Sequence, residues 1–188
     1  MSYRLALLGH TVVAVDLLTN SQDGLGAAVH YKKRLTTLFP RFQAELDILP
    51  FADASFDMTI FNASFHYSED YERTLGEAIR CTRDGGLVVI ADTPWYAEEE
   101  SGRAMVEQKH ADFTTRYGFP SNSLASLEYL TDARLQQLSE RFGIQWRIHT
   151  PYYGMRWAMR PLLARLHGSR TPSLFRIYAA EVKQQVQP

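Results

Sequence analysis

The sequence predicts an α/β fold built around a mainly parallel β-sheet, and two features carry this prediction. Thr11–Val15 and Leu87–Asp92 are short apolar runs rich in β-branched residues, as expected of strands that helices cover on both faces. Helical patterns alternate with such runs, which implies right-handed crossovers between parallel strands. Residues 144–149 and 174–182 look like a final pair of strands, so we expect an antiparallel strand to close the sheet.

Local signals define the elements before residue 92. We expect the end of a helix at residues 3–8, followed by a strand at 11–15, a helix at 23–38, strands at 43–46 and 56–62, and a helix at 70–82. Pro40 should end the first complete helix, because proline cannot continue one. Gly85 and Gly86 should stop the helix of residues 70–82 before the next strand.

Two long excursions interrupt the remainder of the chain. Residues 94–130 are aromatic and polar and exceed an ordinary connection, so we expect a functional excursion or lid there. A helix should begin at Thr131 and stop at Gly143. The second excursion, at about residues 152–172, contains Pro161, which either kinks one helix or starts a second one at its first position.

Length and composition predict one globular domain over residues 1–188, with its core at about 5–93 and 131–183. Cys81 is the only cysteine, which excludes a disulfide framework. The six histidines show no metal-ligand spacing, so we expect no metal site. No apolar run is long enough to span a membrane, and a cytoplasmic protein is the simplest interpretation.

Charge is spread unevenly, although the net charge is only −1. Between residues 141 and 180 there are seven arginines and no acid, whereas acids gather between Asp92 and Glu107. Both runs can be solvated faces. Alternatively, the arginine-rich segment meets an anionic substrate or an acidic membrane surface. No recognised nucleic-acid-binding module is present, so we expect no nucleic-acid partner.

Polar residues follow three of the predicted strands. Asp16 comes directly after an apolar strand, Asp47 follows the next short strand, and Asn62 ends the third. Ligands of parallel sheets bind outside the carboxyl ends of the strands, and a carboxylate there can accept hydrogen bonds from both hydroxyls of a ribose. The alternative is that Asp16 and Asp47 only cap helices or turns.

Three motifs between Ala44 and Asp92 make a more specific comparison possible. They are D-x-LPF-x-D-x-SFD at Asp47–Asp57, the aromatic-histidine stretch Phe65–Tyr67, and the helix end before two glycines at Arg80–Gly86. With HTVVAVD they resemble class I S-adenosylmethionine-dependent methyltransferases of the small-molecule "type 11" group, over roughly residues 5–92. The resemblance implies a Rossmann-like methyltransferase sheet, S-adenosylmethionine as cofactor, and a small-molecule acceptor.

The resemblance also implies roles for individual residues. Asp16 would hold the cofactor ribose with Leu17 beside the adenine, and Asp47 would hold the adenine amino group with Ile48 beside it. Asn62 and Ala63 would lie near the methionine part of the cofactor, and His66 would face the active site. For an oxygen nucleophile His66 is the first candidate for a general base, although a packing role is the alternative.

One departure from the family concerns the start of the chain. The family's first strand ends in a glycine-rich loop about 20 residues before the ribose acid, but the ribose acid here is Asp16. We therefore expect a sheet that lacks the first strand and the glycine loop, and an N-terminally truncated chain. Gly24 and Gly26 lie on the wrong side of Asp16 to replace that loop. A fold that has re-paired, or a strand supplied by another chain, would explain the same pattern.

Two other functional classes remain open. A methyltransferase-like domain without its glycine loop could be a non-catalytic binding or interaction protein, and a Rossmann enzyme that uses NAD would also place an acid like Asp16. For the methyltransferase, the arginine-rich segment favours an anionic or lipid-like acceptor. An unfilled sheet edge would favour homo-oligomers.

Overall fold

The computed structural model describes residues 1–121 and 125–183, and the chain divides into two compact units, Met1–Ala52 and Asp53–Pro188. Among the described residues, no helix has the length and apolar character needed to cross a membrane.

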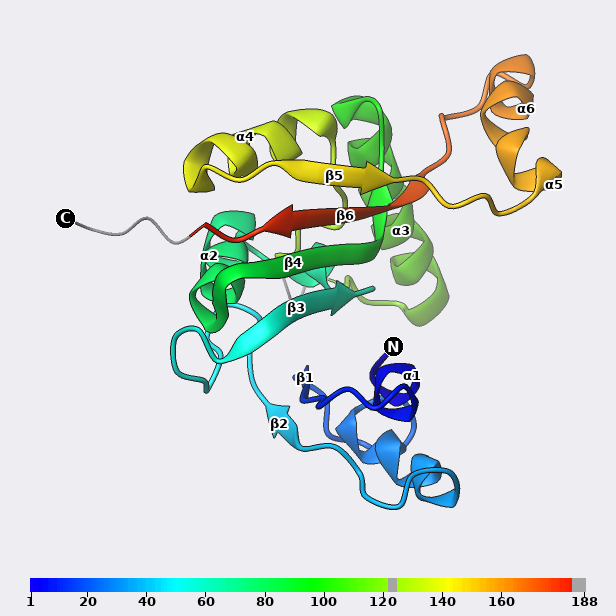
Figure 1. The fold of residues 1–188 in the computed structure, drawn as a ribbon. Coiled ribbons are helices and arrows are strands. Elements are labelled where there is room, and N and C mark those ends of the chain that lie inside the picture. Colours follow the sequence, from blue (N-terminus) through cyan, green and yellow to red (C-terminus); the bar gives the residue numbers. More distant parts are fainter. Residues whose placement is uncertain (122–124, 184–188) are drawn as a thin grey trace. The chain divides into compact units, whose positions relative to one another are not determined.

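The first unit contains a helix, a 3-10 helix and two short strands (Figure 1). Their bounds are α1 Ser2–Leu7, β1 Ala14–Asp16, η1 Leu25–Lys33 and β2 Arg41–Gln43. The two strands are parallel, with Asp16 opposite Gln43. The helix end at residues 3–8 is confirmed, whereas the strand predicted at 43–46 is wrong in position because β2 ends at Gln43.

The helix predicted over residues 23–38 is also wrong in type and extent, because the segment forms only the short 3-10 helix η1. Its start is tied back to the loop after β1: the Leu25 N–H donates to the Leu18 carbonyl at 2.9 Å. A Cβ on Gly24 or Gly26 would collide with the backbone of residues 18–20. Glycine is therefore needed at both positions for this close approach.

The second unit is built on a four-stranded sheet with the order β3-β4-β6-β5 (Figure 1). The strands are β3 Phe56–Asn62, β4 Thr82–Trp95, β5 Trp146–His149 and β6 Leu174–Glu181. β3 and β4 are parallel, and β6 runs antiparallel to both of its neighbours. The mainly parallel sheet with an antiparallel closing strand is thus confirmed. Within the described residues, β1 and β3 each pair on one side only.

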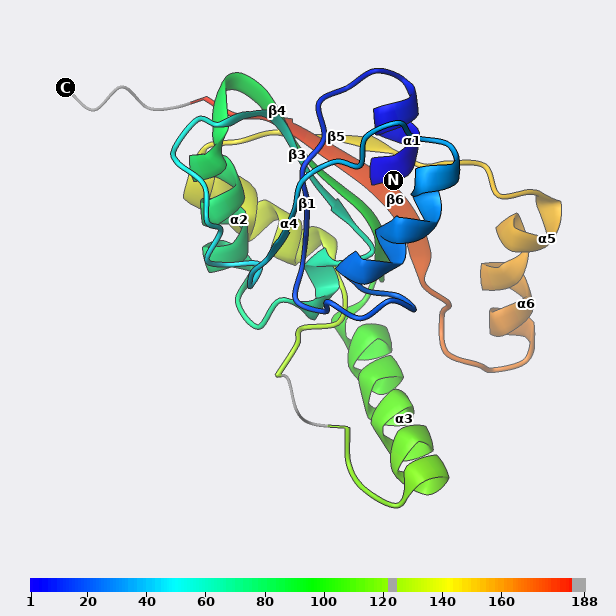
Figure 2. The same ribbon diagram turned by 90° about the horizontal axis from the view of Figure 1, so that it is seen from below.

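Helices α2 (Tyr71–Cys81) and α4 (Asp132–Phe142) pack together on one face of this sheet (Figure 2). The core between sheet and helices is fully buried at Leu75, Val88 and Tyr178. Side chains alternate along β4, so Val88 and Ile90 face this core. Burial of these side chains stabilises the sheet by roughly 1.5–3 kcal/mol each.

The boundaries around α2 and α4 follow capping chemistry. Asp70 caps α2 by accepting from two backbone N–H groups, and Gly143 ends α4 with a left-handed φ of 63°. However, the prediction that Gly85 and Gly86 stop α2 is wrong, because β4 already begins at Thr82. Gly86 instead allows a close approach: a Cβ there would meet the Asp57 carbonyl at 2.8 Å.

The remaining helices of the second unit are a short 3-10 helix and the helices of the two excursions. The short 3-10 helix η2 (Phe65–Tyr67) follows β3, and α3 (Glu99–Tyr117) follows β4. Helices α5 (Met155–Ala158) and α6 (Arg160–Leu166) lie between β5 and β6. Pro161 sits in the first turn of α6, so it starts a second helix rather than kinking one.

Replacing Asp70 with alanine should lower the free energy of unfolding by about 1 kcal/mol. The carboxylate accepts from the N–H groups of Glu72 and Arg73 at 2.9 and 3.1 Å, and alanine leaves both donors without this partner. Urea unfolding measures the change. Glu107→Ala, which removes an exposed acid within α3, is the control and should stay within about 0.5 kcal/mol. Equal effects of the two substitutions would contradict a capping role.

Candidate functional site

Asp16 and Leu17 lie at the carboxyl end of β1 in the first unit. Oδ1 of Asp16 accepts from the Leu18 N–H at 2.9 Å, while Oδ2 has no hydrogen-bond partner among the residues that the structure describes. Gln43 donates through Nε2 to the Leu17 carbonyl at 2.9 Å and so ties the ends of β1 and β2 together. The exposed carboxylate is therefore held in place with one oxygen available to a ligand.

Asp47 and Ile48 follow β2, with Asp47 in a turn. Ile48 is 64% exposed and Leu17 is 41% exposed. The first unit thus combines a fixed carboxylate at the end of β1 with two exposed apolar side chains, Leu17 next to that carboxylate in sequence and Ile48 five residues after β2. Small-molecule sites commonly pair apolar surface with a few polar groups in this way.

In the second unit, Asn62 ends β3 and Ala63 follows in a left-handed conformation with φ 54°. Asp92 on β4 has φ 53°, and it directly follows Ala91, which pairs with Asn62. The Ala63 N–H donates to the Ala91 carbonyl at 3.0 Å. Ala63 and Asp92, two non-glycine residues with a left-handed backbone, are thus neighbours near the carboxyl ends of the parallel strands β3 and β4. Each such conformation costs about 1–3 kcal/mol, and backbone strain of this kind clusters at functional sites.

His66 lies in η2, just beyond this strained pair, and is 9% exposed. Its Nδ1 is buried without a hydrogen-bond partner among the described residues. Burial lowers the pKa of His66; the nearby Glu128 carboxylate opposes this effect and the Lys109 ammonium adds to it. The imidazole is therefore neutral near pH 7 and able to accept a proton.

Glu128 and Lys109 are neighbours of His66 that the sequence did not single out. Lys109 on α3 donates through Nζ to both carboxylate oxygens of Glu128 at 2.8 Å, and the Ser126 hydroxyl donates to one of them at 3.0 Å. The Glu128 N–H donates to the His66 carbonyl at 2.8 Å. One signal was present in the sequence: Glu128 is the only acid between Asp112 and Asp132.

The donor set does not favour a metal site. Within residues 1–121 and 125–183, no three His, Cys, Asp or Glu side chains come together in a way that could hold a metal ion. Cys81 is fully buried, and burial raises the pKa of its thiol. A buried neutral thiol is a poor nucleophile.

Residues 1–90 match the protein family described as "Methyltransferase domain". The matched region begins in the first unit and ends within β4. It contains all seven residues to which the resemblance assigned a role.

Solved structures with the same fold include three methyltransferase-related proteins. A Bacillus halodurans protein assigned as a methyltransferase is 15% identical, with a TM-score of 0.65 over 97% of this chain and 87% of its own. A SAM-dependent methyltransferase from Methanosarcina mazei is 12% identical, with a TM-score of 0.60 over 98% and 88%. A Haloferax volcanii protein assigned as a methyltransferase, solved with the Trm112 methyltransferase activator, is 17% identical, with a TM-score of 0.57 over 100% and 90%. At these identities the likeness shows the fold alone.

The buried neutral imidazole should make the protein lose stability in acid. Because the folded-state pKa of His66 lies below 6.5, the unfolded chain binds a proton that the folded chain does not as the pH falls through this value. The contribution of neutral His66 to the free energy of unfolding is complete above pH 6.5 and is lost between 6.5 and the lowered pKa. Urea unfolding at about pH 7 and about pH 5 measures the loss.

His66→Gln is the informative variant, because it removes the titrating group. The stability difference between the unaltered chain and His66→Gln should shrink in acid. His30→Gln, at an exposed position on η1, is the matched control and should follow the unaltered chain. Parallel stability profiles for the unaltered chain and His66→Gln would rule out the lowered pKa.

Proposed function

We propose that this chain, which carries the class I methyltransferase fold and a methyltransferase family match over residues 1–90, transfers a methyl group to a small-molecule acceptor. S-adenosylmethionine is the cofactor that the fold and the family match support. When bound, it supplies an activated methyl group, and the protein supplies orientation and proton handling.

The observation that carries this proposal is Oδ2 of Asp16 at the carboxyl end of β1, which has no hydrogen-bond partner among the described residues. Its chemistry fits a ribose, whose hydroxyls can donate to a carboxylate that is already oriented by the Leu18 N–H. We assign the ribose to Asp16 and the adenine to Leu17, Asp47 and Ile48. The apolar side chains of Leu17 and Ile48 are exposed enough to contact a flat base.

Asn62, Ala63 and His66 are assigned to the methionine end of the cofactor and to the acceptor. The neutral imidazole of His66 would take the proton of an acceptor hydroxyl as the hydroxyl oxygen bonds to the methyl carbon. The methyl–sulfur bond would break in the same step, with S-adenosylhomocysteine as the leaving group. Glu128 and Lys109 act as positioning residues: Glu128 fixes the backbone of His66, and Lys109 holds Glu128. The strained backbone at Ala63 and Asp92 supports a functional edge here.

Three further assignments extend this proposal. The acceptor is an anionic or lipid-like small molecule, because the arginine-rich segment of residues 141–180 lies in the same unit as His66. We place the protein in the cytoplasm. The open edges of β1 and β3 among the described residues favour association with a second copy.

Calorimetric titration with S-adenosylhomocysteine tests the cofactor assignment. Asp16→Asn keeps an oxygen that can accept from the Leu18 N–H but removes the charge, so the dissociation constant should rise about tenfold or more. Asp23→Asn is the matched control, because Asp23 is an exposed acid in the loop that follows β1. Its affinity should equal that of the unaltered chain.

A parallel titration with NAD separates the alternatives. Binding of NAD and not of S-adenosylhomocysteine would replace the methyltransferase with a nicotinamide enzyme. Binding of neither would favour a non-catalytic interaction protein. Binding that Asp16→Asn leaves unchanged would remove Asp16 from the ribose site.

A further inference from the structure

A cavity of about 450 Å³ lies in the second unit, beyond the carboxyl end of β4. Its polar lining comes from the residue after β4, from α3, from α6 and from the loop before β6: Tyr96, Gln108, Arg160, Ser169, Arg170 and Ser173. This volume is within the range of small-molecule sites. None of the residues assigned to the cofactor or to proton transfer lines it.

The charge in this cavity is uncompensated. Two guanidinium groups, those of Arg160 and Arg170, face it, and no acid lines it. Among the described residues, neither arginine forms an ion pair with a carboxylate. Arg160 is half-buried and Arg170 is exposed. Two guanidinium groups that share a cavity without a carboxylate partner favour binding of an anion there.

Arg160 provides the clearest sign of a missing partner. Its guanidinium stacks on the Trp157 ring at 4.0 Å from the centroid, which holds the group in place. Its Nη1 is nevertheless buried without a hydrogen-bond acceptor among the described residues. A fixed donor without an acceptor is expected where a ligand completes the set.

Arg170 is oriented by neutral groups, which leave its charge available. It donates to the Tyr96 hydroxyl at 3.0 Å and to Oε1 of Gln108 at 3.2 Å. Tyr96 is only 3% exposed and is therefore a rigid support. Ser169 and Ser173 add hydroxyl donors to the same lining.

We propose that this cavity binds the carboxylate or phosphate group of the methyl acceptor through Arg160 and Arg170. The identification of the ligand as the methyl acceptor rests on the proposed function. The evidence for an anion site comes from the cavity alone. Guanidinium groups match the planar oxygens of carboxylates and the oxygens of phosphates. The location fits an acceptor, because Tyr96 follows the strand whose end carries the strained Asp92.

The test uses three probes at constant ionic strength: inorganic phosphate, benzoate, and benzamide as the neutral counterpart of benzoate. Calorimetry should detect phosphate or benzoate, and whichever binds more tightly identifies the anionic group. Arg160→Gln and Arg170→Gln should each weaken that binding about tenfold or more. The bound anion should raise the melting temperature of the unaltered chain and not that of Arg160→Gln.

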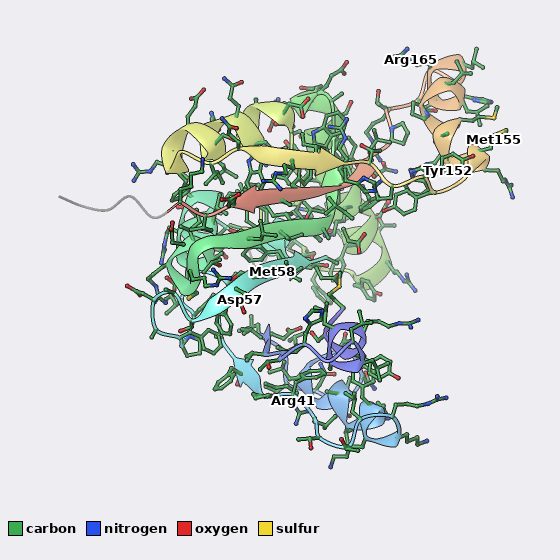
Figure 3. The ribbon with its side chains drawn as sticks, in the orientation of Figure 1. Arg41, Asp57, Met58, Tyr152, Met155 and Arg165 are labelled. Atoms are coloured by element: carbon green, nitrogen blue, oxygen red, sulfur yellow. The ribbon has the colours of Figure 1, made fainter. Side chains whose placement is uncertain are left out.

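Arg165→Gln is the matched control, because Arg165 is an exposed arginine on the same helix, α6, and does not line the cavity (Figure 3). Circular dichroism establishes that each variant is folded. The proposal is overturned if neither anion binds, if benzamide binds as tightly as benzoate, or if Arg165→Gln weakens binding as much as Arg160→Gln does.

A titration with S-adenosylhomocysteine on the same samples keeps the two proposals apart. If the anion binds and S-adenosylhomocysteine does not, the anion site is supported, and the assignment of its ligand as a methyl acceptor is overturned. S-adenosylhomocysteine binding without anion binding would support the proposed function and overturn this inference.

Discussion

The ion pair between Glu128 and Lys109 is the interaction on which the carboxyl edge of the β3–β4 pair depends. Glu128 is 7% exposed and has a left-handed backbone with φ 66°, a conformation that costs about 1–3 kcal/mol. It persists because the carboxylate accepts two hydrogen bonds from Lys109 and the N–H donates to the His66 carbonyl. A carboxylate buried to this degree needs its cation, so α3, η2 and residues 126–128 are held to one another.

The residues that directly follow Glu128 connect this ion pair to the support of the cavity. Directly after Glu128, Tyr129 donates to the Glu99 carboxylate at 2.6 Å, and Leu130 pairs with Trp95 at the end of β4. The Tyr96 N–H then donates to the Leu130 carbonyl at 2.9 Å. Tyr96 in turn orients Arg170. The same segment thus fixes His66 at one end and the support of the cavity at the other, although the two sites share no lining residue.

Elements with strong local signals were predictable from the sequence. β3 has the predicted bounds, Phe56–Asn62, and α2 and α4 match because Asp70 and Gly143 cap them. The resemblance to class I methyltransferases is confirmed by the family match and the fold, whereas the roles of individual site residues stay predictions. The pairing of Glu128 with Lys109 was not predictable, because the two residues are 19 positions apart and no periodicity in the sequence indicates that they meet.

The arginine-rich segment shows why a charge run is hard to interpret from sequence alone. Within the part of the chain that the structure describes, three of its seven arginines form ion pairs: Arg141 with Glu72, Arg147 with Glu181, and Arg176 with Asp132. All three acids lie outside residues 141–180, so the absence of acids within the run did not mean absence of partners. Arg160 and Arg170 differ in being held by aromatic and neutral groups at a cavity. The solvated-face interpretation and the anion-site interpretation are therefore compatible, because each applies to different arginines of the same segment.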